Sequence, residues 1–367
     1  MAPVRHTRNY IFYAFFLVVL FEVSFRMLFA FRPGEFDETS SWRRQWILRH
    51  RWGAEIYYSF DRYDPTKGWA AKAGLRDVRV FKEKTLNTNS RGLRGRTEYT
   101  YEPTPGTLRI VVLGDSFTFG DGVSDDETYC ANLQTILPHV EIINMGVHGY
   151  GHDQMLILFR EEGVKYRPDI VLLGFAAADM PRNRLLFRDY AKPAFMIDGE
   201  RLRLVGSPVP RPEQMLRWNW ARPRTLDVVS TLAYLVRQNT GLEEARTTRV
   251  TARVLDELVD EIHDAGAKPV FVYLPIGRED ASSGPPAAGE RFFSDWCARS
   301  GRVTCLSARP SLVAEAARNP DIVTRGHWKP AGHRVVAAAI AEGLIGSGLV
   351  APRPDTSGGT RQDDASR

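Results

Sequence analysis

The stretch RIVVLGDSFTFGDGV, residues 109–123, decides how the rest of the chain is interpreted. It opens with a run of β-branched and other apolar residues, which is typical of a buried strand, and it then turns through glycines. The hydroxyl of Ser116 follows a Gly-Asp pair directly after the predicted strand. Such a serine is either a nucleophile or simply a polar residue at the end of a strand.

Four further apolar segments share the character of this strand and alternate with helical patterns. The predicted strands are residues 108–114, 140–146, 168–175, 268–275 and 302–308. The predicted helices are residues 128–137, 153–165, 249–265, 289–299 and 330–345. Strands this apolar are buried on both faces, so the pattern predicts an α/β fold with a parallel sheet and helices on each side.

Polar and glycine-rich sequences follow three of these strands, and ligands bind at the carboxyl ends of parallel strands. The first strand ends in Gly-Asp-Ser116, the second in NMGVHGYG (144–151) and the third in GFAAAD (174–179). In RGHWKPAGH, His327 precedes the last predicted helix, so Ser116 and His327 can meet at one rim of the sheet. His327 would be the base that a serine nucleophile needs, and the glycines let backbone N–H groups approach an oxyanion.

Composition argues against several other classes of protein. The chain has 367 residues, of which 43% are hydrophobic, so it can form one large domain or two small ones. Its net charge is +5, but the arginines are scattered and no zinc-finger spacing or long basic run is present, so we expect no nucleic-acid partner. The histidines and cysteines show no metal-ligand pattern, so we expect no metal and no cofactor.

The chain contains three cysteines, Cys130, Cys297 and Cys305. Cys297 and Cys305 are close in sequence and can form a disulfide bond if the domain is exported. They can equally remain as two unpaired thiols, and the sequence leaves both alternatives open.

Residues 9–31 are long and apolar enough to cross a bilayer as a helix. Glu22 and Arg26 interrupt this segment at i,i+4 spacing, where they can pair. No small-residue cleavage site follows, which favours an uncleaved anchor over a signal peptide. We therefore predict a single-pass membrane protein with residues 1–8 in the cytoplasm. Arg5 and Arg8 support this orientation, and the arginines after the span oppose it: Arg32, Arg43 and Arg44.

The remaining segments complete the predicted domain organisation. Residues 32–105 are expected to connect the anchor to the α/β domain and to pack on its core. That domain is predicted to cover residues 106–349, with a cap or binding insertion at 180–225 that contains a hairpin turning at Asp198-Gly199. Residues 350–367 are rich in Pro, Gly, Ser and Asp and are predicted to be disordered.

Over roughly residues 63–349 the sequence resembles the SGNH/GDSL hydrolase family, which implies a three-layer, flavodoxin-like fold. GDSFTFGDGV is similar to the family's first block and implies that Ser116 is the nucleophile. NMGVHGYG is similar to the second block and implies that Gly149 forms the oxyanion hole together with the N–H of Ser116. YDPTKGW (63–69) and LNTNSRGLRG (86–95) resemble membrane-anchored bacterial members associated with cell-surface polysaccharide, whose catalytic domains lie on the periplasmic side.

The third block departs from the family pattern. An Asn precedes the Asp of GFxxND in the family and completes the oxyanion hole, whereas this chain has Ala178 before Asp179. A methyl group cannot donate a hydrogen bond. Asn183 is the nearest downstream amide, five residues late, and Asp115 and Asp179 lie beside the predicted site.

The last block also departs from the family pattern. The family has an Asp two or three residues before the His, where this chain has Arg325 and Thr324, although His327 is retained. Asp321, six residues before His327, is a candidate replacement. Arg325 is either a binding group for an anionic part of the substrate or a solvated charge.

These observations support three functional hypotheses. The first is a serine esterase or O-acyltransferase that acts on acyl esters of an envelope glycan, with Ser116 and His327 as the catalytic pair. The second is a catalytically degenerate module that binds glycan through Trp218 and Trp220 of the insertion. The third is a scaffold in a membrane assembly for polysaccharide export or modification, with the Glu22–Arg26 helix as its docking element.

Overall fold

The structure is a computed structural model that describes residues 3–31, 38–51, 57–81, 83–276, 284–319, 322 and 326–352. It divides into two compact units, which are described separately. The sheet unit comprises Ala73–Tyr150, Leu158–Asp179 and Asp256–Arg367. The anchor unit comprises Met1–Lys72, Gly151–Ile157 and Met180–Leu255.

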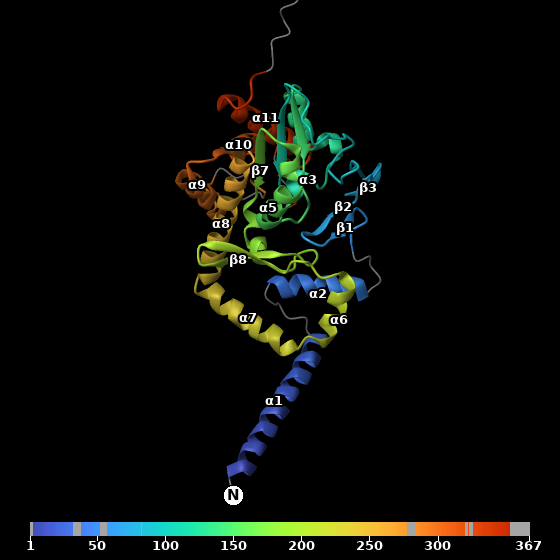
Figure 1. The fold of residues 1–367 in the computed structure, drawn as a ribbon, viewed down its shortest axis with the longest axis vertical. Coiled ribbons are helices and arrows are strands. Elements are labelled where there is room, and N and C mark those ends of the chain that lie inside the picture. The colour runs from blue at the N-terminus through green and yellow to red at the C-terminus, as the bar shows by residue number, and fades with distance from the viewer. Residues whose placement is uncertain are drawn as a thin grey trace, which may run out of the picture. The chain divides into compact units, whose positions relative to one another are not determined.

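The sheet unit is built on five parallel strands, as the alternating pattern predicts (Figure 1). Their order across the sheet is β11-β10-β7-β5-β6, which is the flavodoxin-like order with a topological switch point between β5 and β7. Each strand lies within the residues predicted for it. The bounds are β5 (Leu108–Leu113), β6 (Val140–Asn144), β7 (Ile170–Phe175), β10 (Lys268–Tyr273) and β11 (Thr304–Ser307).

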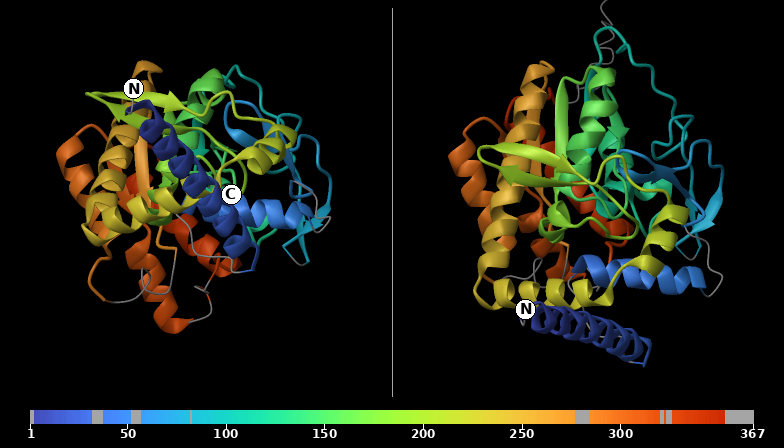
Figure 2. Two further views of the ribbon diagram at one scale, coloured as in Figure 1. Left: turned by 90° about the horizontal axis from the view of Figure 1, so that it is seen from below. Right: turned by 60° about the horizontal axis from the view of Figure 1, so that its bottom comes forward.

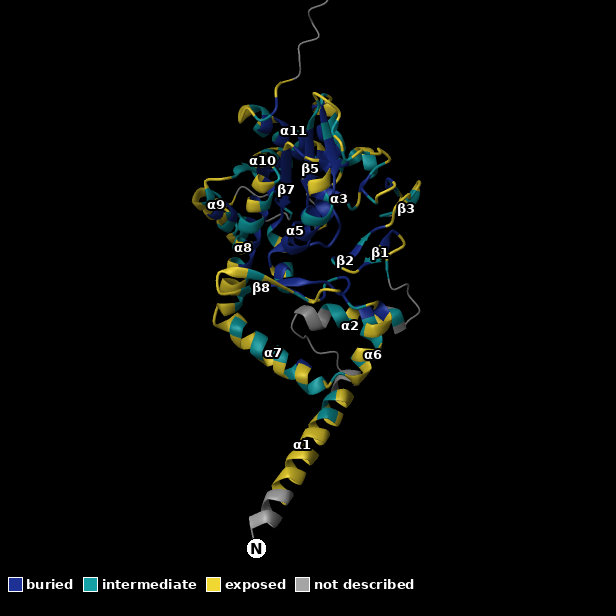
Figure 3. Ribbon diagram, in the orientation of Figure 1, coloured by how far each residue is buried: buried dark blue, intermediate teal, exposed yellow. Residues whose placement is uncertain are grey.

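Helices cover both faces of this sheet, and side chains of alternate strand residues point to opposite faces. On one face, α4 (Tyr129–Ile136), α10 (Arg309–Arg318) and α11 (Pro330–Gly346) enclose a core with Ile110, Val112 and Leu172. On the other face, the aromatic rings of α9 (Ala288–Ser300) lie on the strands, with Phe293 against Phe175. The buried strands are dark blue in Figure 3. This arrangement confirms the predicted three-layer α/β fold.

The predicted helices all form, with shifted ends. The helix predicted at 153–165 is α5 (His152–Glu161) followed by the 3-10 helix η2 (Gly163–Tyr166), and the one predicted at 249–265 is α8 (Leu242–Asp264). Several short elements were not predicted. In the sheet unit they are β3 (Val78–Val80), β4 (Lys84–Leu86), α3 (Ser116–Phe119), η1 (Asp125–Glu127), η3 (Ala177–Asp179) and α10.

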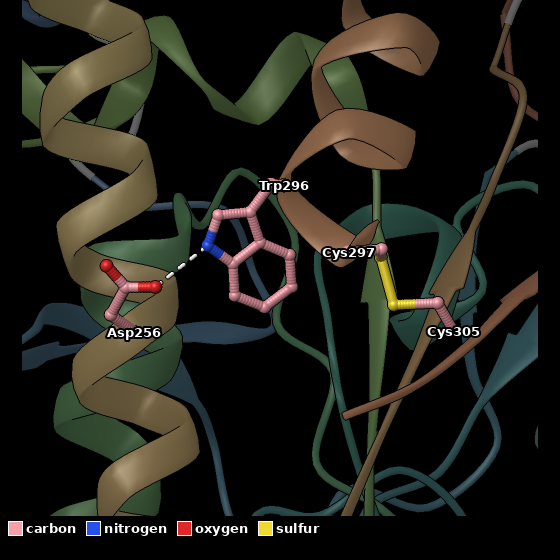
Figure 4. The surroundings of a disulfide bond; sticks show 4 residues. All are labelled: Asp256, Trp296, Cys297 and Cys305. Carbon is pink, nitrogen blue, oxygen red and sulfur yellow. Dashed lines mark hydrogen bonds between the residues drawn. A yellow bond between two sulfur atoms is a disulfide. The ribbon is translucent and has the colours of Figure 1, made fainter. Parts of the chain in front are cut away.

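A disulfide bond joins Cys297 of α9 to Cys305 of β11, and Figure 4 shows its surroundings. The structure therefore resolves the two open alternatives in favour of a bridge, while Cys130 is a free, buried thiol. In the same region the indole Nε1 of Trp296 donates a hydrogen bond of 2.9 Å to Asp256 Oδ1. Both contacts fix α9 to its neighbours in the sheet unit.

The anchor unit begins with α1 (Pro3–Phe31). Its segment Asn9–Met27 has a mean hydropathy of 1.7 and contains no buried residue, and it is long and apolar enough to span a membrane. Figure 2 gives two further views of α1 and its neighbours. The unit also contains α2 (Glu38–Arg51), the hairpin of β1 (Asp61–Asp64) and β2 (Gly68–Ala71), η4 (Pro181–Arg184), α6 (Pro212–Ala221) and α7 (Arg224–Asn239).

The predicted hairpin of the insertion is present as β8 (Ala194–Asp198) and β9 (Arg201–Val205). Asp198 pairs with Arg201, so the two-residue loop is Gly199 and Glu200, one residue later than predicted. Gly199 has a φ of +62°, a conformation that glycine adopts without steric cost.

Candidate active site

Ser116 lies at the carboxyl end of β5, beside the switch point of the sheet, and is the first residue of the short helix α3 (Ser116–Phe119). The carboxylate of Asp115 caps this helix, because its Oδ1 accepts a 3.0 Å hydrogen bond from the N–H of Phe117. The turn needs a glycine at 114, because a Cβ there would lie 1.9 Å from Thr118 Oγ1. The GDS sequence thus forms a tight strand-to-helix turn that presents the serine hydroxyl.

His327 lies in the segment just before α11, and the structure brings it to Ser116. The distance between His327 Nε2 and Ser116 Oγ is 2.7 Å. The imidazole packs on the ring of Phe117, with 4.8 Å between centroids, and the next residue, Trp328, is buried and donates to the carbonyl of Pro275. These contacts orient the imidazole toward Ser116, in the geometry expected of a nucleophile and its general base.

Asp121 is a carboxylate near this pair that the sequence analysis missed. Its Oδ2 lies 4.0 Å from His327 Nε2, and its backbone N–H donates to the carbonyl of Ser116 at 2.9 Å. It therefore lies on the Ser116 side of the imidazole, at Nε2. The only sequence signal was its position in GDSFTFGDGV, five residues after the serine.

The loop that carries Asp121 is braced by Arg94, a residue of the LNTNSRGLRG segment. The buried Arg94 guanidinium pairs with Asp125 and donates to the carbonyls of Gly120 and Val123, on either side of Asp121. Since an arginine offers five donors in a fixed plane, one side chain can hold several loop carbonyls at once. This segment therefore has a structural part in shaping the site.

The loop after β6, which carries Gly149, packs closely on α3. A Cβ at Gly146 would lie 2.4 Å from the backbone nitrogen of Phe119, and Asn144 Nδ2 donates to the carbonyl of Thr118 at 2.8 Å. Gly149 itself has a φ of +73°, which favours glycine. Its contribution to an oxyanion hole stays a prediction.

The third block ends in the 3-10 helix η3 (Ala177–Asp179). Ala178 is exposed, whereas Asp179 is buried and its N–H donates to the carbonyl of Ala176. Asn183 does not replace the missing amide. Its Nδ2 donates 2.8 Å to Thr251 Oγ1 and lies 3.3 Å from His152 Nδ1, both in the anchor unit.

Two predicted site residues, Asp321 and Arg325, lie outside the described residues. Among the described residues, no three His, Cys, Asp or Glu side chains gather as a group that could hold a metal ion. The described residues bring together a Ser–His pair and two carboxylates, since Asp115 Oδ2 lies 3.5 Å from Ser116 Oγ and Asp121 Oδ2 lies 4.0 Å from His327 Nε2.

Residues 112–335 match the model of one protein family, the GDSL-like lipase/acylhydrolase family. The fold is similar to that of a protein assigned to the G-D-S-L lipolytic family from Desulfitobacterium hafniense (13% identity, TM-score 0.41, covering 65% of this chain and 100% of that one). It is also similar to the acetyl xylan esterase AlAXEase (11%, 0.41, 65% and 100%) and to the esterase EstA from Pseudoalteromonas sp. (12%, 0.40, 66% and 99%).

A search of curated protein sequences found no match. The family match, however, spans more than half of the chain and includes both Ser116 and His327. The chain belongs to the GDSL-like lipase/acylhydrolase family, a family of hydrolases that act on ester bonds.

Proposed function

We propose that this chain is a membrane-anchored serine esterase or O-acyltransferase that acts on ester-linked acyl groups, in particular acetyl groups, of an envelope glycan. The observation that carries the proposal is the 2.7 Å contact between Ser116 Oγ and His327 Nε2. A serine hydroxyl is a weak nucleophile at neutral pH, and a base in hydrogen-bond contact is what activates it.

In the proposed first half-reaction, Ser116 Oγ bonds to the ester carbonyl carbon while His327 Nε2 takes the hydroxyl proton. The carbonyl oxygen becomes an oxyanion, which the N–H groups of Ser116 and Gly149 stabilise. When the ester C–O bond breaks, the leaving alkoxide takes the proton from His327. An acyl-Ser116 intermediate and a free sugar hydroxyl result.

In the second half-reaction His327 removes a proton from the acceptor, whose oxygen bonds to the acyl carbon. The bond between that carbon and Ser116 Oγ then breaks, and His327 returns the proton to Ser116 Oγ. With water as the acceptor the enzyme is an esterase, and with a sugar hydroxyl it is a transferase.

The side chain of Ala178 supplies no donor to the oxyanion, and removing one such donor typically lowers turnover by about 10²- to 10³-fold. We therefore propose a slow enzyme.

The proposed location and substrate have separate support. The segment Asn9–Met27 is long and apolar enough to span a membrane, and the Cys297–Cys305 bridge is typical of an exported, oxidising compartment. The proposal of a glycan substrate rests on the similarity of YDPTKGW and LNTNSRGLRG to envelope-associated family members. We propose the inner membrane, with the sheet unit on the periplasmic side and a polysaccharide-modifying assembly as partner.

The deciding experiment treats the full chain in detergent with a fluorophosphonate probe and reads the intact mass, with Ser116→Ala as control. One adduct that is lost in the control supports the proposal. Acetylated glycan then separates the two reactions, because an esterase releases acetate and a transferase moves the label to a second glycan.

The absence of any adduct from a folded protein would contradict catalysis. Ala178, which replaces the amide donor, favours the alternative in that case: a degenerate hydrolase fold that binds glycan or acts as a scaffold. Binding of the same acetylated glycan by the unreactive protein would identify the binding module.

A further inference from the structure

Helix α7 exposes a row of apolar side chains that its own unit does not cover. Val229, Leu232, Leu235 and Val236, called here the outer stripe, have exposed fractions of 60%, 58%, 44% and 62%. At 3.6 residues per turn they occupy an arc of about 120° on one side of the helix. The charged residues of α7 lie off this arc: Arg224, Asp227 and Arg237.

The other side of α7 is the side that builds the anchor unit. Its Asp227 is buried and pairs with Arg43, Arg222 and Arg224 at 2.9, 2.8 and 3.1 Å. Burial alone would raise the pKa of Asp227, but these hydrogen bonds and charges hold it below its usual value. The same side lines a cavity of about 1020 Å³ with Ser230, Ala233 and Tyr234. Val229, at the edge of the outer stripe, also borders this cavity, whereas Leu232, Leu235 and Val236 do not line it and face away from the packed interior of the unit.

The start of α7 is fixed to α1 through Glu22. Pro223 precedes the helix and provides no side-chain cap, and Glu22 supplies the missing acceptors. Its carboxylate accepts from the N–H of Arg224 at 2.9 Å and from the N–H and hydroxyl of Thr225 at 3.0 and 2.6 Å. An ionised group inside an apolar span is costly unless it has partners, and here the partners are the free N–H groups of a helix end.

The position of Glu22 in α1 sets the depth at which α7 begins. Glu22 lies five residues before Met27, the last residue of the apolar segment. At 1.5 Å per residue that is about 7.5 Å inside the end of the span. Helices that lie in a membrane interface bury their apolar faces about 5–10 Å deep, so α7 begins at the depth expected of such a helix.

The residues around this junction are those that membrane interfaces favour. Trp218 and Trp220 of α6 have exposed fractions of 59% and 81%, and the carbonyl of Trp220 accepts from Arg26 of α1. Trp is enriched where a membrane meets water. Two carboxylates, Glu22 and Asp227, pair here with four arginines: Arg26, Arg43, Arg222 and Arg224. These six groups carry a net charge of +2, which suits anionic headgroups.

We propose that α6 and α7 lie in the interfacial layer of the same bilayer that α1 spans, with the outer stripe against the acyl chains and the arginine cluster at anionic phospholipid headgroups. The inference rests on the membrane anchoring in the proposed function and adds a second membrane contact to it. The anchor unit is then held on the bilayer surface by α1 and α7 together.

The test places one fluorescent label at a time along α7 of the full chain. Because Cys130 is buried and the other two cysteines are bridged, an introduced cysteine is the only reactive thiol. Leu232→Cys and Val236→Cys probe the outer stripe, and Gln238→Cys is the matched control, exposed on another side of the helix. Each variant is labelled with nitrobenzoxadiazole and reconstituted into vesicles of phosphatidylethanolamine and phosphatidylglycerol.

The proposal expects nitroxide-bearing lipid to quench the Leu232 and Val236 labels several-fold more than it quenches the Gln238 label, with the reverse order for aqueous iodide. Equal iodide quenching at all three positions would overturn it, because the stripe would then face water. Disulfide cross-linking between two copies of Leu232→Cys would also overturn it, because a second chain would then cover the stripe.

Extraction with alkaline carbonate separates this inference from the proposed function. Release of the full chain from the vesicles means that α1 does not span the bilayer, and the anchoring in the proposed function fails. Retention of the chain together with iodide-accessible labels means that only the α7 inference fails. Neither result depends on the reactivity of Ser116.

Discussion

Ser116 and His327 come from segments more than 200 residues apart, and their contact could be predicted from the sequence because each residue lies next to a regular element at one rim of a parallel sheet. Asp121 could not be assigned in this way. It lies in a turn, and only the path of that turn, held by Arg94, brings its carboxylate within 4.0 Å of the imidazole.

The role of Asp121 can be tested with Asp121→Asn. A negative charge 4.0 Å from Nε2 stabilises the imidazolium that forms when Ser116 is deprotonated. At 4 Å, two opposite unit charges attract each other by about 1 kcal/mol in water and by about 4 kcal/mol near a protein surface. We therefore expect kcat/KM to fall about tenfold. The acidic limb of the pH–rate profile should also move to lower pH, since the imidazole is then easier to deprotonate.

The matched control for this change is Asp126→Asn, an exposed carboxylate in the same loop region. It should leave both the rate and the pH profile unchanged. Equal effects of the two substitutions would mean that Asp121 acts only through the overall charge of the protein.

Ala178 provides a gain-of-function test at the residue scale. Ala178→Asn restores the amide of the family pattern at an exposed position, so we expect turnover of an aryl acetate to rise, by up to about 10²-fold. The double variant with Ser116→Ala should be inactive. Unchanged turnover in a folded Ala178→Asn protein would mean that the oxyanion site already has its donors.

Among the helices and strands, periodicity predicted most of those whose apolar side chains face the sheet, although it missed α10, whose Leu312 is buried in the core. It missed α6 and α7, which lie in or just after the stretch predicted as an insertion. The outer stripe of α7 and the exposed Trp218 and Trp220 point away from any core of the anchor unit. The apolar stripe of α7 has helical spacing, but it packs on no core, and the sequence analysis took the stretch before it as an insertion.

The bridge between α9 and β11 makes a prediction about stability. Replacing Cys297 and Cys305 by Ser removes a bridge between residues eight positions apart in the sequence. The loss of this bridge should lower the free energy of unfolding by about 2–3 kcal/mol. Thermal unfolding of the full chain in detergent measures the loss, and reductant should lower the melting temperature of the natural protein but not of the double variant. An unchanged melting temperature would show that the packing of α9 alone stabilises the β11 edge of the sheet.

His333 predicts a pH dependence at the contact between α11 and α4. Its Nδ1 accepts the N–H of Tyr129 at 3.1 Å, and burial lowers the pKa of His333 to about 3. Between about pH 6.5 and about pH 3 the unfolded chain binds a proton here that the folded chain does not. Stability from this residue is therefore full at neutral pH and falls, by at most about 1.4 kcal/mol per pH unit, as the pH drops through that window.

His333→Gln keeps a hydrogen-bond acceptor but removes the titrating group. We expect its unfolding free energy, measured by urea at several pH values, to fall less steeply than that of the natural protein below about pH 6.5. Parallel curves for the two proteins would show that His333 is not the titrating group.

On the scale of the whole molecule, the sequence predicts one domain over residues 106–349 with an insertion, whereas contacts in the structure group Gly151–Ile157 and Met180–Leu255 with the N-terminal Met1–Lys72. The links are tertiary. The side chain of Gln154 donates to the carbonyl of Lys67 at 2.7 Å, and the buried Lys192 pairs with Asp153. Chain order carries no signal that segments this far apart pack together.

The division into two units predicts a local effect of removing residues 1–31. The deletion takes away Glu22, so α7 loses the carboxylate that caps its first N–H groups, a loss worth about 0.5–2 kcal/mol for a helix cap. Hydrogen exchange should therefore quicken in α7 and leave β5 and α11 unchanged, because those elements belong to the sheet unit. Fluorophosphonate labelling at Ser116 should persist, since its contact with His327 lies within that unit.

Glu22→Gln in the full chain should give a smaller effect in α7 alone, because one amide oxygen then replaces two carboxylate acceptors. Faster exchange throughout both units would instead mean that α1 stabilises the molecule as a whole.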